Sequence, residues 1–343
     1  MTWKLKSLTA ALALCAGVAT AQADGELHIY NWGNYTSPDL IKKFEKTYNV
    51  KVTLTDYDSN DTALAKVRAG GHGFDIVVPS ANFIPVWVKE GLLLESRPDQ
   101  MENFKNMDPR WVDVPWDPGR HYSVPWQWGT SGPVVDTAIY KGDINTNAIW
   151  LDPPAELVGK IDVVPEMNDV MYAAIKYVGG KWCTDDKAVL KKARDTLKAA
   201  KPKWLAMDYG IEKFDTHDYS AAFYYNGAAF RAREATPTVR FGFAKEGFAL
   251  FMDSVAVLKD AKNPENAKLF QNFIMDPENA ALISNFATYA NGIKGSEKFM
   301  RAGLKDAPEL NIPAEFASAA EWNEMCSPEV NDLYTKIWKD LLK

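Results

Sequence analysis

The stretch "ELHIYNWGNYTSPDLIKKFEKTYNVKV", residues 26–52, decides the class of fold. Its first seven residues, 26–32, alternate in polarity, which predicts a β-strand. Ser37 and Pro38 follow as an N-cap and a proline at the first helical position, and apolar residues recur at helical spacing up to Tyr48. A second strand is expected over residues 50–58. Strand, loop, helix and strand in this order are typical of an α/β fold.

The next segments repeat the pattern. "TALAKVRAG" predicts a helix that stops at Gly70, and the nearly apolar "FDIVVPS" over residues 74–80 predicts a strand buried on both faces. Strands that alternate with helices indicate a mostly parallel sheet, and ligands of such sheets bind beyond the carboxyl ends of the strands. We therefore expect the loops at 32–35 and 80–82 to face one crevice.

The rest of the chain predicts two domains. Residues 102–133 are rich in Trp, Pro and Gly and indicate extended chain and turns, with a crossing into the second region at 131–133. Helical patterns dominate until about residue 250, after which an α/β pattern returns. A chain that leaves a domain and comes back makes a multi-stranded hinge. The expected lobes are 24–131 plus 252–298, and 132–251 plus 299–343.

The first 23 residues predict a cleaved signal peptide. Lys4 and Lys6 precede an apolar run, and the small-x-small pattern at 21–23 predicts cleavage after Ala23 and export to the periplasm. The alternative, a membrane anchor, is disfavoured because the run is shorter than the roughly 18 to 20 residues that span a bilayer. A lipid anchor on Cys15 is disfavoured by the preceding Leu14, where a small residue is required.

The charge of the chain limits its partners. Loss of the leader moves the net charge from −6 to −8, because it removes two lysines and no acid and leaves 37 basic against 45 acidic residues. An acidic surface disfavours nucleic acid or an anionic membrane as a partner and suits a cationic ligand. Cys183 and Cys326 remain in an oxidising compartment, where they could pair or stay free; the sequence leaves this open.

Signatures of catalysis and of cofactor binding are missing from the sequence. It contains no G-x-S-x-G, H-E-x-x-H, P-loop or G-x-G-x-x-G motif, and the four histidines, at 28, 72, 121 and 217, show no metal-ligand spacing. We expect no enzyme, no cofactor and no metal site. One alternative stays open: the adjacent Tyr224 and Tyr225 could bind ferric ion as phenolates, although ring packing or a ligand wall explains them as well.

The remaining candidate groups are aromatic or acidic. Aromatic rings that cover methylene groups and attract an ammonium, together with carboxylates that hold the amine ends, would suit an elongated aliphatic cation. Spacing alone does not bring these groups together. The candidates are Trp32, Tyr35, Tyr225 and Phe251 among the rings, and Asp169 and Asp253 among the acids.

A resemblance does bring them together. The opening stretch, "AKVRAGGHGFDIVVPSANFI" (65–84), "VPWQWGTSG" (124–132) and the segment 243–281 with "LFMDS" resemble, in order and spacing, the periplasmic spermidine/putrescine-binding proteins of polyamine ABC importers. The resemblance covers residues 26–295. It implies a bilobal type II binding-protein fold without catalysis, a monomer that closes over its ligand, and inner-membrane ABC permease subunits as partners.

The family's binding loops carry over by motif. The first, aromatic-x-acid-Tyr, matches residues 32–35, and the acid at the start of a helix in the second lobe matches Asp169, with Glu166 as the fallback one turn earlier. The residues that the resemblance implies for ligand binding are Trp32, Asn34, Tyr35, Ser80, Asn82, Asp169, Tyr225, Phe251, Asp253 and Tyr289.

Two departures concern the ligand. Asn34 stands where the family usually has Asp or Glu, and Ala228 stands where putrescine-type members can carry an acid. A charged hydrogen bond contributes roughly 1.5 to 3 kcal/mol against about 1 for a neutral one, so the loss of one carboxylate predicts about tenfold weaker binding of a second ammonium. Putrescine or spermidine is the expected ligand; agmatine, an amino-acid-like or an opine-like cation is the alternative, and ferric ion at Tyr224 and Tyr225 a further one.

Overall fold

The computed structural model describes residues 24–343 except 215 and 217. The predicted leader at 1–23 and its cleavage after Ala23 lie outside the described residues. Across the part that is described, no helix combines the length and the apolarity needed to cross a bilayer.

The opening unit forms as predicted, with β1 Gly25–Trp32, α1 Pro38–Tyr48 and β2 Val50–Tyr57. Ser37 caps α1 by accepting a hydrogen bond from the backbone N–H of Leu40 at 3.3 Å. The helix ends at Asn49, whose φ of 54° is a left-handed conformation that Asn tolerates. β1 pairs in parallel with β2 along its whole length.

Further strands and helices follow in the expected order. The strands are β3 Ile76–Val77, β4 Ser123–Asp136, β5 Ile161–Val163, β6 Ala221–Tyr225, β7 Val239–Phe241, β8 Phe248–Val257 and β9 Ala320–Trp322. The helices are α2 Asn60–Arg68, α3 Ile84–Lys89, α4 Ala148–Leu151, α5 Met167–Tyr177, α6 Lys187–Ala200, α7 Asn226–Ala235, α8 Pro264–Ile274, α9 Pro277–Ala287 and α10 Pro328–Leu342.

Two local predictions differ from the structure. The strand expected over 74–80 is buried as predicted, but only Ile76–Val77 pairs as a strand, and Pro79 has no N–H with which to extend the ladder. The segment 102–133 contains the expected turns and extended chain, the latter as the first part of β4, but it also forms two 3-10 helices that were not predicted, Glu102–Asn106 and Pro109–Trp111.

The sheet is mixed, which corrects the prediction of a mostly parallel one. Its order is β2-β1-β3-β8-β4-β6-β5, with β7 on β4 and β9 on β8. β1 pairs in parallel with β2 and β3, and β5 with β6, whereas β8 is antiparallel to β3 and β4, and β4 to β6 and β7. β4 and β8 are antiparallel because β4 carries the chain away from the first region and β8 carries it back.

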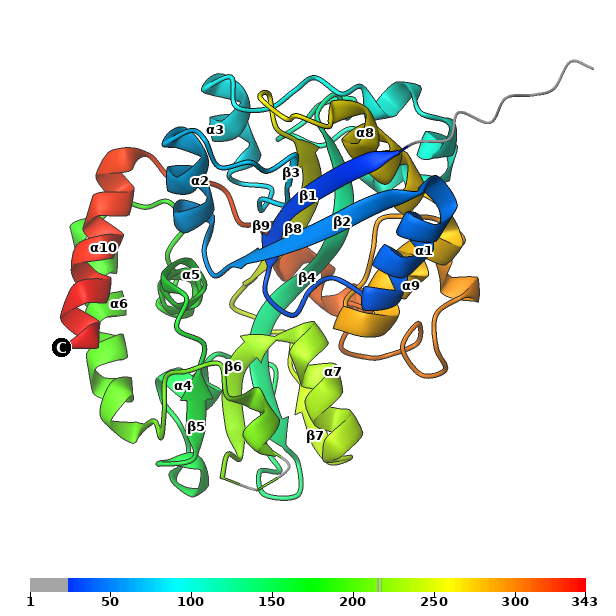
Figure 1. Cartoon of the computed structure of the whole chain (residues 1–343). Coiled ribbons are helices and arrows are strands. Elements are labelled where there is room, and N and C mark those ends of the chain that lie inside the picture. Colours follow the sequence, from blue (N-terminus) through cyan, green and yellow to red (C-terminus); the bar gives the residue numbers. More distant parts are fainter. Residues whose placement is uncertain (1–23, 215, 217) are drawn as a thin grey trace, which may run out of the picture.

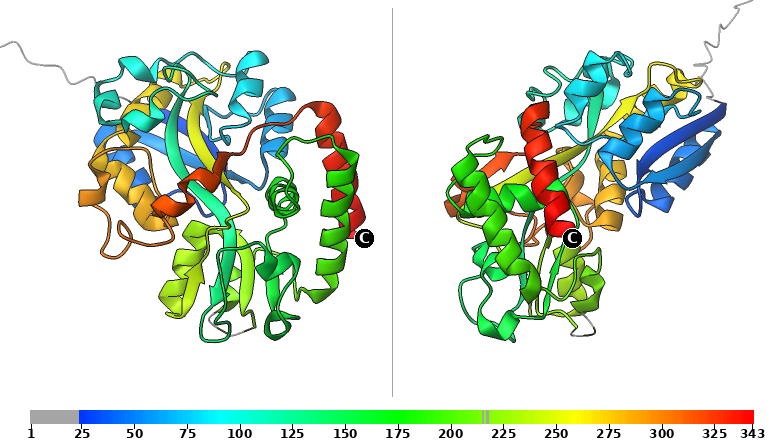
Figure 2. Two further views of the ribbon diagram at one scale, coloured as in Figure 1. Left: turned by 180° about the vertical axis from the view of Figure 1, so that it is seen from behind. Right: turned by 90° about the vertical axis from the view of Figure 1, so that its left-hand side faces the viewer.

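The apolar side chains form two large hydrophobic cores, and the long strands β4 and β8 contribute to both. These two strands run from one half of the molecule into the other (Figure 1). β4 contributes Trp126 to the first core and Val134 to the second, and β8 contributes Phe248 to the second and Met252 to the first. The view from behind in Figure 2 shows both strands running between the two halves. The chain therefore changes cores within β4 and within β8, close to the crossings that the sequence predicts; the boundaries of the lobes stay a prediction.

β4 and β8, the strands that pass between the two cores, form the hinge, and the C-terminal segment adds a third strand to it. β9 pairs in parallel with the start of β8, and the indole of Trp322 packs edge-on against Trp116 and Trp111, with ring centroids 4.8 and 5.6 Å away. Both of these indoles belong to the first core, whereas Tyr334 of α10 is buried in the second. The segment thus links the two cores.

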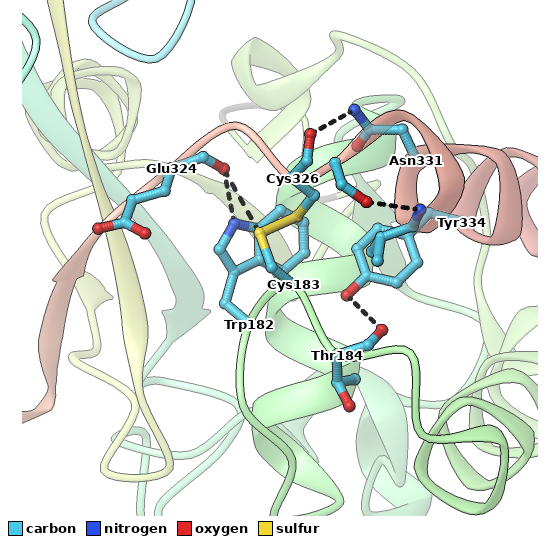
Figure 3. The surroundings of a disulfide bond; sticks show 9 residues. Trp182, Cys183, Thr184, Glu324, Cys326, Asn331 and Tyr334 are labelled. Carbon is cyan, nitrogen blue, oxygen red and sulfur yellow. Dashed lines mark hydrogen bonds between the residues drawn. A yellow bond between two sulfur atoms is a disulfide. The ribbon is translucent and has the colours of Figure 1, made fainter.

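A disulfide fastens this segment, which answers the question that the sequence left open. Cys183, after α5, bonds to Cys326, just before α10, across 143 residues of sequence (Figure 3). Around it, the indole N–H of Trp182 donates to the Glu324 carbonyl at 2.8 Å, and the Tyr334 hydroxyl donates to the Thr184 carbonyl at 3.2 Å. The bond ties the end of the hinge to the second core.

Candidate functional site

A cavity of about 500 Å³ lies between the two cores, and all ten residues that the resemblance implied line it. Its walls come from the loops after β1 and β3, the first turn of α5, the end of β6, the middle of β8 and the segment after α9. The prediction that the loops at 32–35 and 80–82 face one crevice is therefore confirmed, because both line this cavity.

Asp253 lines the cavity and is only 6% exposed. Its carboxylate accepts hydrogen bonds from the Ser80 hydroxyl at 2.7 Å and from the Tyr35 hydroxyl at 3.0 Å. Burial raises the pKa of Asp253 to about 6, and the two hydrogen bonds limit the rise because they favour the ionised form. The carboxylate is thus buried, partly satisfied and without a cation among the described side chains that hydrogen-bond to it.

The loop after β3 is held against β8 so that Ser80 reaches this carboxylate. The backbone N–H of Ala81 donates to the Met252 carbonyl at 2.7 Å. Asn60, at the start of α2, accepts from the backbone N–H of Ser80 and donates to its hydroxyl, both at 3.0 Å. Since the hydroxyl accepts from Asn60, its own proton is directed to Asp253.

Asp169 lines the cavity from the first turn of α5, where the positive end of the helix dipole favours an anion. Its carboxylate accepts from the Ser131 hydroxyl at 2.8 Å and from the Tyr225 hydroxyl at 3.3 Å. Burial raises the pKa of Asp169, while both hydrogen bonds oppose the rise. Asp169 and Asp253 therefore have the same construction: a carboxylate held by one serine and one tyrosine.

A row of four aromatic rings joins the two carboxylates. Tyr35, which donates to Asp253, lies edge-on to Tyr289 with ring centroids 5.9 Å apart. Tyr289 lies 5.8 Å from Phe251, and Phe251 lies 5.6 Å from Tyr225, which donates to Asp169. The row gives the cavity an apolar wall with an anionic group at each end.

Trp32, the remaining ring of the predicted set, is held by contacts outside this row. Its indole N–H donates to the Val78 carbonyl at 3.0 Å, and its ring packs at a tilt on Tyr57 with centroids 4.6 Å apart. The indole N–H is thus already used, so Trp32 offers the cavity a ring surface.

Asn34 and Asn82 complete the predicted set in the cavity wall. Asn34 is exposed and has a φ of 58°. Asn and Asp are the side-chain-bearing residues that adopt this left-handed conformation most readily, so the backbone favours an Asn as well as the acid that the family usually has. Ala228, the other departure, is buried and also lines the cavity.

Glu166, the fallback acid, lies in the cavity as well, so both acids of this helix start are placed there. Burial raises the pKa of Glu166 to about 7, and the charges of Asp169 and Asp58 add to the rise, whereas a hydrogen bond from the Tyr209 hydroxyl lowers it. Tyr209 is 53% exposed and was not predicted. The cavity wall therefore contains a carboxyl group whose pKa lies near neutral pH.

Sequence reasoning missed other wall residues, notably Tyr209, Arg231 and Asn323. Asn323 directly follows β9, beyond residue 295 where the resemblance ends, and no described side chain or backbone group bonds its buried amide oxygen. Arg231 belongs to α7, and its spacing from Ala228 on that helix was the only sequence signal that could have indicated it.

The ferric alternative gains no support from the arrangement. Tyr224 and Tyr225 line the cavity, but the Tyr225 hydroxyl donates to Asp169. Within residues 24–343 without 215 and 217, no three His, Cys, Asp or Glu side chains gather as metal ligands. His217 lies outside the described residues.

Comparison with known proteins places the chain in a family. The model for "bacterial extracellular solute-binding protein" matches residues 39–312. The spermidine/putrescine-binding periplasmic protein of Escherichia coli is 29% identical over 92% of this chain and 92% of its own length. The putrescine-binding periplasmic protein SpuD of Pseudomonas aeruginosa is 31% identical over 88% of this chain and 87% of its own length.

Solved structures agree on the fold. One from Listeria monocytogenes, named for a spermidine/putrescine ABC transporter, has a TM-score of 0.85 and 28% identity over 92% of this chain and 98% of its own. The substrate-binding protein PotD of Streptococcus pneumoniae has a TM-score of 0.80 at 23% identity, over 93% and 99% of the two chains. The fold is the bilobal type II fold of periplasmic binding proteins, as the resemblance implied. The chain belongs to the bacterial extracellular solute-binding proteins, which serve ABC transporters by binding a solute and are not enzymes.

Proposed function

We propose that this protein binds a polyamine, putrescine or spermidine, between its lobes in the periplasm and delivers it to the permease of an ABC importer. One observation carries the proposal: two similarly built carboxylates, Asp253 and Asp169, lie at the two ends of one row of four aromatic rings. Relatives named for spermidine and putrescine binding support the same class of ligand.

The chemistry of the wall suits an aliphatic diamine. An ammonium against Asp253 would form charge-assisted hydrogen bonds with a carboxylate that is already removed from water, so the gain is larger than at an exposed site. The ring row covers the methylene groups, whose transfer from water contributes about 0.8 kcal/mol for each CH₂. In this role Asp253 holds one nitrogen, and Asp169, with Glu166 beside it, holds the other.

Lobe closure links binding to transport. The proposed lobes, 24–131 plus 252–298 and 132–251 plus 299–343, contribute Asp253 and Asp169 respectively, so a ligand reaches both only when the lobes are together. A ligand can shift the equilibrium between open and closed forms only by its difference in affinity for the two. We propose that a closed monomer is the form that the permease recognises.

Another cationic amine is the second candidate, and two observations favour it. The wall has a neutral Asn34 and an apolar Ala228 where an acid would hold a second ammonium, and it includes the cation of Arg231. These groups fit a ligand whose far end is neutral or carries its own acceptor, such as an amino-acid-like or opine-like cation; a guanidino compound such as agmatine belongs to the same test.

Isothermal titration calorimetry of the mature protein, residues 24–343, tests these candidates directly. Putrescine, spermidine, agmatine, a neutral amino acid and a ferric salt should be titrated separately, with Asp253→Asn as the control for the site. Binding of a polyamine with a stabilisation of about 2.7 kcal/mol at a hundredfold excess over Kd is expected in a parallel thermal melt. Binding of ferric ion with no response to any amine would contradict the proposal.

A further inference from the structure

Arg231 lies where the two lobes touch beside the cavity. Its helix, α7, packs into the second core through Ala228 and Ala229, whereas Ala287 and Tyr289 belong to the first core. In Figure 1, α7 and α9 lie on the same side of β4 and β8. The contact between α7 and the segment 287–289 is therefore a contact between lobes.

The contact is made of hydrogen bonds between groups of the protein itself. The guanidinium of Arg231 donates to the Ala287 carbonyl and to the Thr288 hydroxyl, both at 2.9 Å. The Thr288 hydroxyl lies within donor distance of the Gly227 carbonyl of α7, at 2.8 Å. Thr288 is the C-cap of α9, so the cation also meets the negative end of that helix dipole.

Close packing reinforces these bonds. A Cβ atom on Gly227 would lie 2.5 Å from ring carbons of Tyr289, far inside contact distance. The backbone of α7 thus touches the very ring that stands between Tyr35 and Phe251 in the cavity wall. Separation of α7 from segment 287–289 would break the Arg231 bonds and also remove a support of that ring.

We propose that Arg231 is a positioning residue that latches the two lobes together in the absence of ligand, and thereby raises the apparent affinity for whatever the cavity binds. When only a fraction of molecules has the binding-competent form, the apparent Kd rises in inverse proportion to that fraction. The latch itself is independent of ligand identity; its effect on amine affinity rests on the proposed function.

A second role for Arg231 predicts the opposite sign. The side chain is exposed and lines the cavity, so its charge repels a bound ammonium. If repulsion were its main effect, its removal would tighten amine binding. If the latch is its main effect, its removal weakens amine binding.

Three variants separate these roles. Arg231→Met removes donor and charge, whereas Arg231→Gln removes the charge and keeps a donor. Arg240→Met is the matched control, because Arg240 is an exposed arginine of the same lobe that donates to the backbone carbonyls of Pro237 and Val239, each at 2.7 Å, and does not line the cavity.

Spin labels report lobe separation directly. Cysteines should replace the exposed Lys66 of α2 and Lys192 of α6, since Cys183 and Cys326 are bonded to each other and do not take up label. Distances measured by electron–electron double resonance without ligand should lengthen in Arg231→Met, change less in Arg231→Gln and stay unchanged in Arg240→Met. The distances at saturating amine should match those of the parent protein.

Amine affinity is the second readout. Arg231→Met should bind the amine about three- to tenfold more weakly than the parent protein, as a smaller competent fraction requires. An unchanged distance distribution without ligand, or tighter amine binding by Arg231→Met, would overturn the latch. If the parent protein binds no amine, the proposed function fails while the ligand-free distances still decide the latch.

Discussion

Tyr35 and Asp253, 218 residues apart in sequence, are joined by a hydrogen bond of 3.0 Å from the phenol to the carboxylate. The bond connects the loop after the first strand with the middle of β8, and the Ser80 hydroxyl donates to the same carboxylate from the loop after the third. One buried acid thus holds three segments of the cavity wall. The described side chains that bond to it are neutral hydroxyls, so they do not balance its negative charge.

Replacement of Asp253 by Asn should remove most amine affinity while keeping the shape of the wall. Loss of one partner of a buried charge pair costs about 3 to 5 kcal/mol, which corresponds to at least about a hundredfold in Kd. Calorimetric titration with putrescine and spermidine measures this. Asp75→Asn is the control, because Asp75 is buried as well but accepts hydrogen bonds from the backbone N–H groups of His28 and Asn263 and does not line the cavity. Equal losses in both variants would contradict the role of Asp253.

The pH dependence of binding follows from the same residue. Burial raises the pKa of Asp253 from 3.8 to about 6 in the ligand-free protein. Between these values the folded state holds a proton that the unfolded chain has released, so this group lowers the stability of the ligand-free protein as pH rises through that range. An ammonium needs the ionised carboxylate, so amine affinity should rise about tenfold from pH 5 to pH 7 and level off above.

Titrations at a series of pH values check this rise, and Asp253→Asn is the control. Whatever increase remains in that variant reports the other acids, chiefly Glu166, whose pKa is raised to about 7. An unaltered pH profile in Asp253→Asn would show that Asp253 does not control binding.

Tyr209→Phe should shift the pH dependence upward. The Tyr209 hydroxyl donates to Glu166 and lowers the pKa of that carboxyl, so removal of the hydroxyl leaves burial less opposed and raises the pKa above about 7. Amine affinity should then fall a few-fold at pH 7 and recover by about pH 9. Tyr140→Phe is the control, because Tyr140 is a half-buried tyrosine outside the cavity wall whose hydroxyl donates to the Asp143 carbonyl. Loss of affinity that is equal at both pH values would point to packing instead.

The disulfide should matter for stability and not for the ligand. Cys183 and Cys326 close a loop of 143 residues, and a cross-link of this span stabilises by about 2 to 5 kcal/mol, mainly by restricting the unfolded chain. The double variant with serine at both positions should unfold at lower denaturant concentration, with an unchanged Kd for the amine. A large loss of affinity would show that the end of the hinge also shapes the cavity.

Local signals predicted the parts of the fold that depend on short stretches. Ser37 and Pro38 fixed the start of α1, and strand ends placed Trp32 and Ser80 in one wall. The sheet was wrongly expected to be mostly parallel, because strand direction in β4 and β8 depends on how the chain travels between the lobes. The Cys183–Cys326 bond likewise depends on a distance in space that no local pattern reports.

The candidate site likewise contains residues that the sequence indicated and residues that only tertiary packing brings into the wall. The resemblance supplied Asp169 and Asp253, but it could not indicate Asn323, which lies beyond its range, or Tyr209, whose partner Glu166 is 43 residues away in sequence. Both enter the wall through tertiary packing. A role that depends on such packing, like the contact of Arg231 with Ala287, becomes visible only in three dimensions.

Asn34 offers the sharpest test of the ligand. Asp tolerates the left-handed φ of 58° as Asn does, so Asn34→Asp adds a charge to the wall without strain in the backbone. A charged hydrogen bond in place of a neutral one should tighten binding of a diamine or spermidine by about tenfold, provided that its second ammonium reaches this loop. Calorimetry with putrescine and with butylamine, which has one ammonium on the same carbon chain, separates this contact from a general increase in negative charge. Asn34→Gly keeps the backbone conformation and removes the side chain. An equal gain for both amines would show that no second ammonium meets residue 34, and would favour a ligand whose far end is neutral.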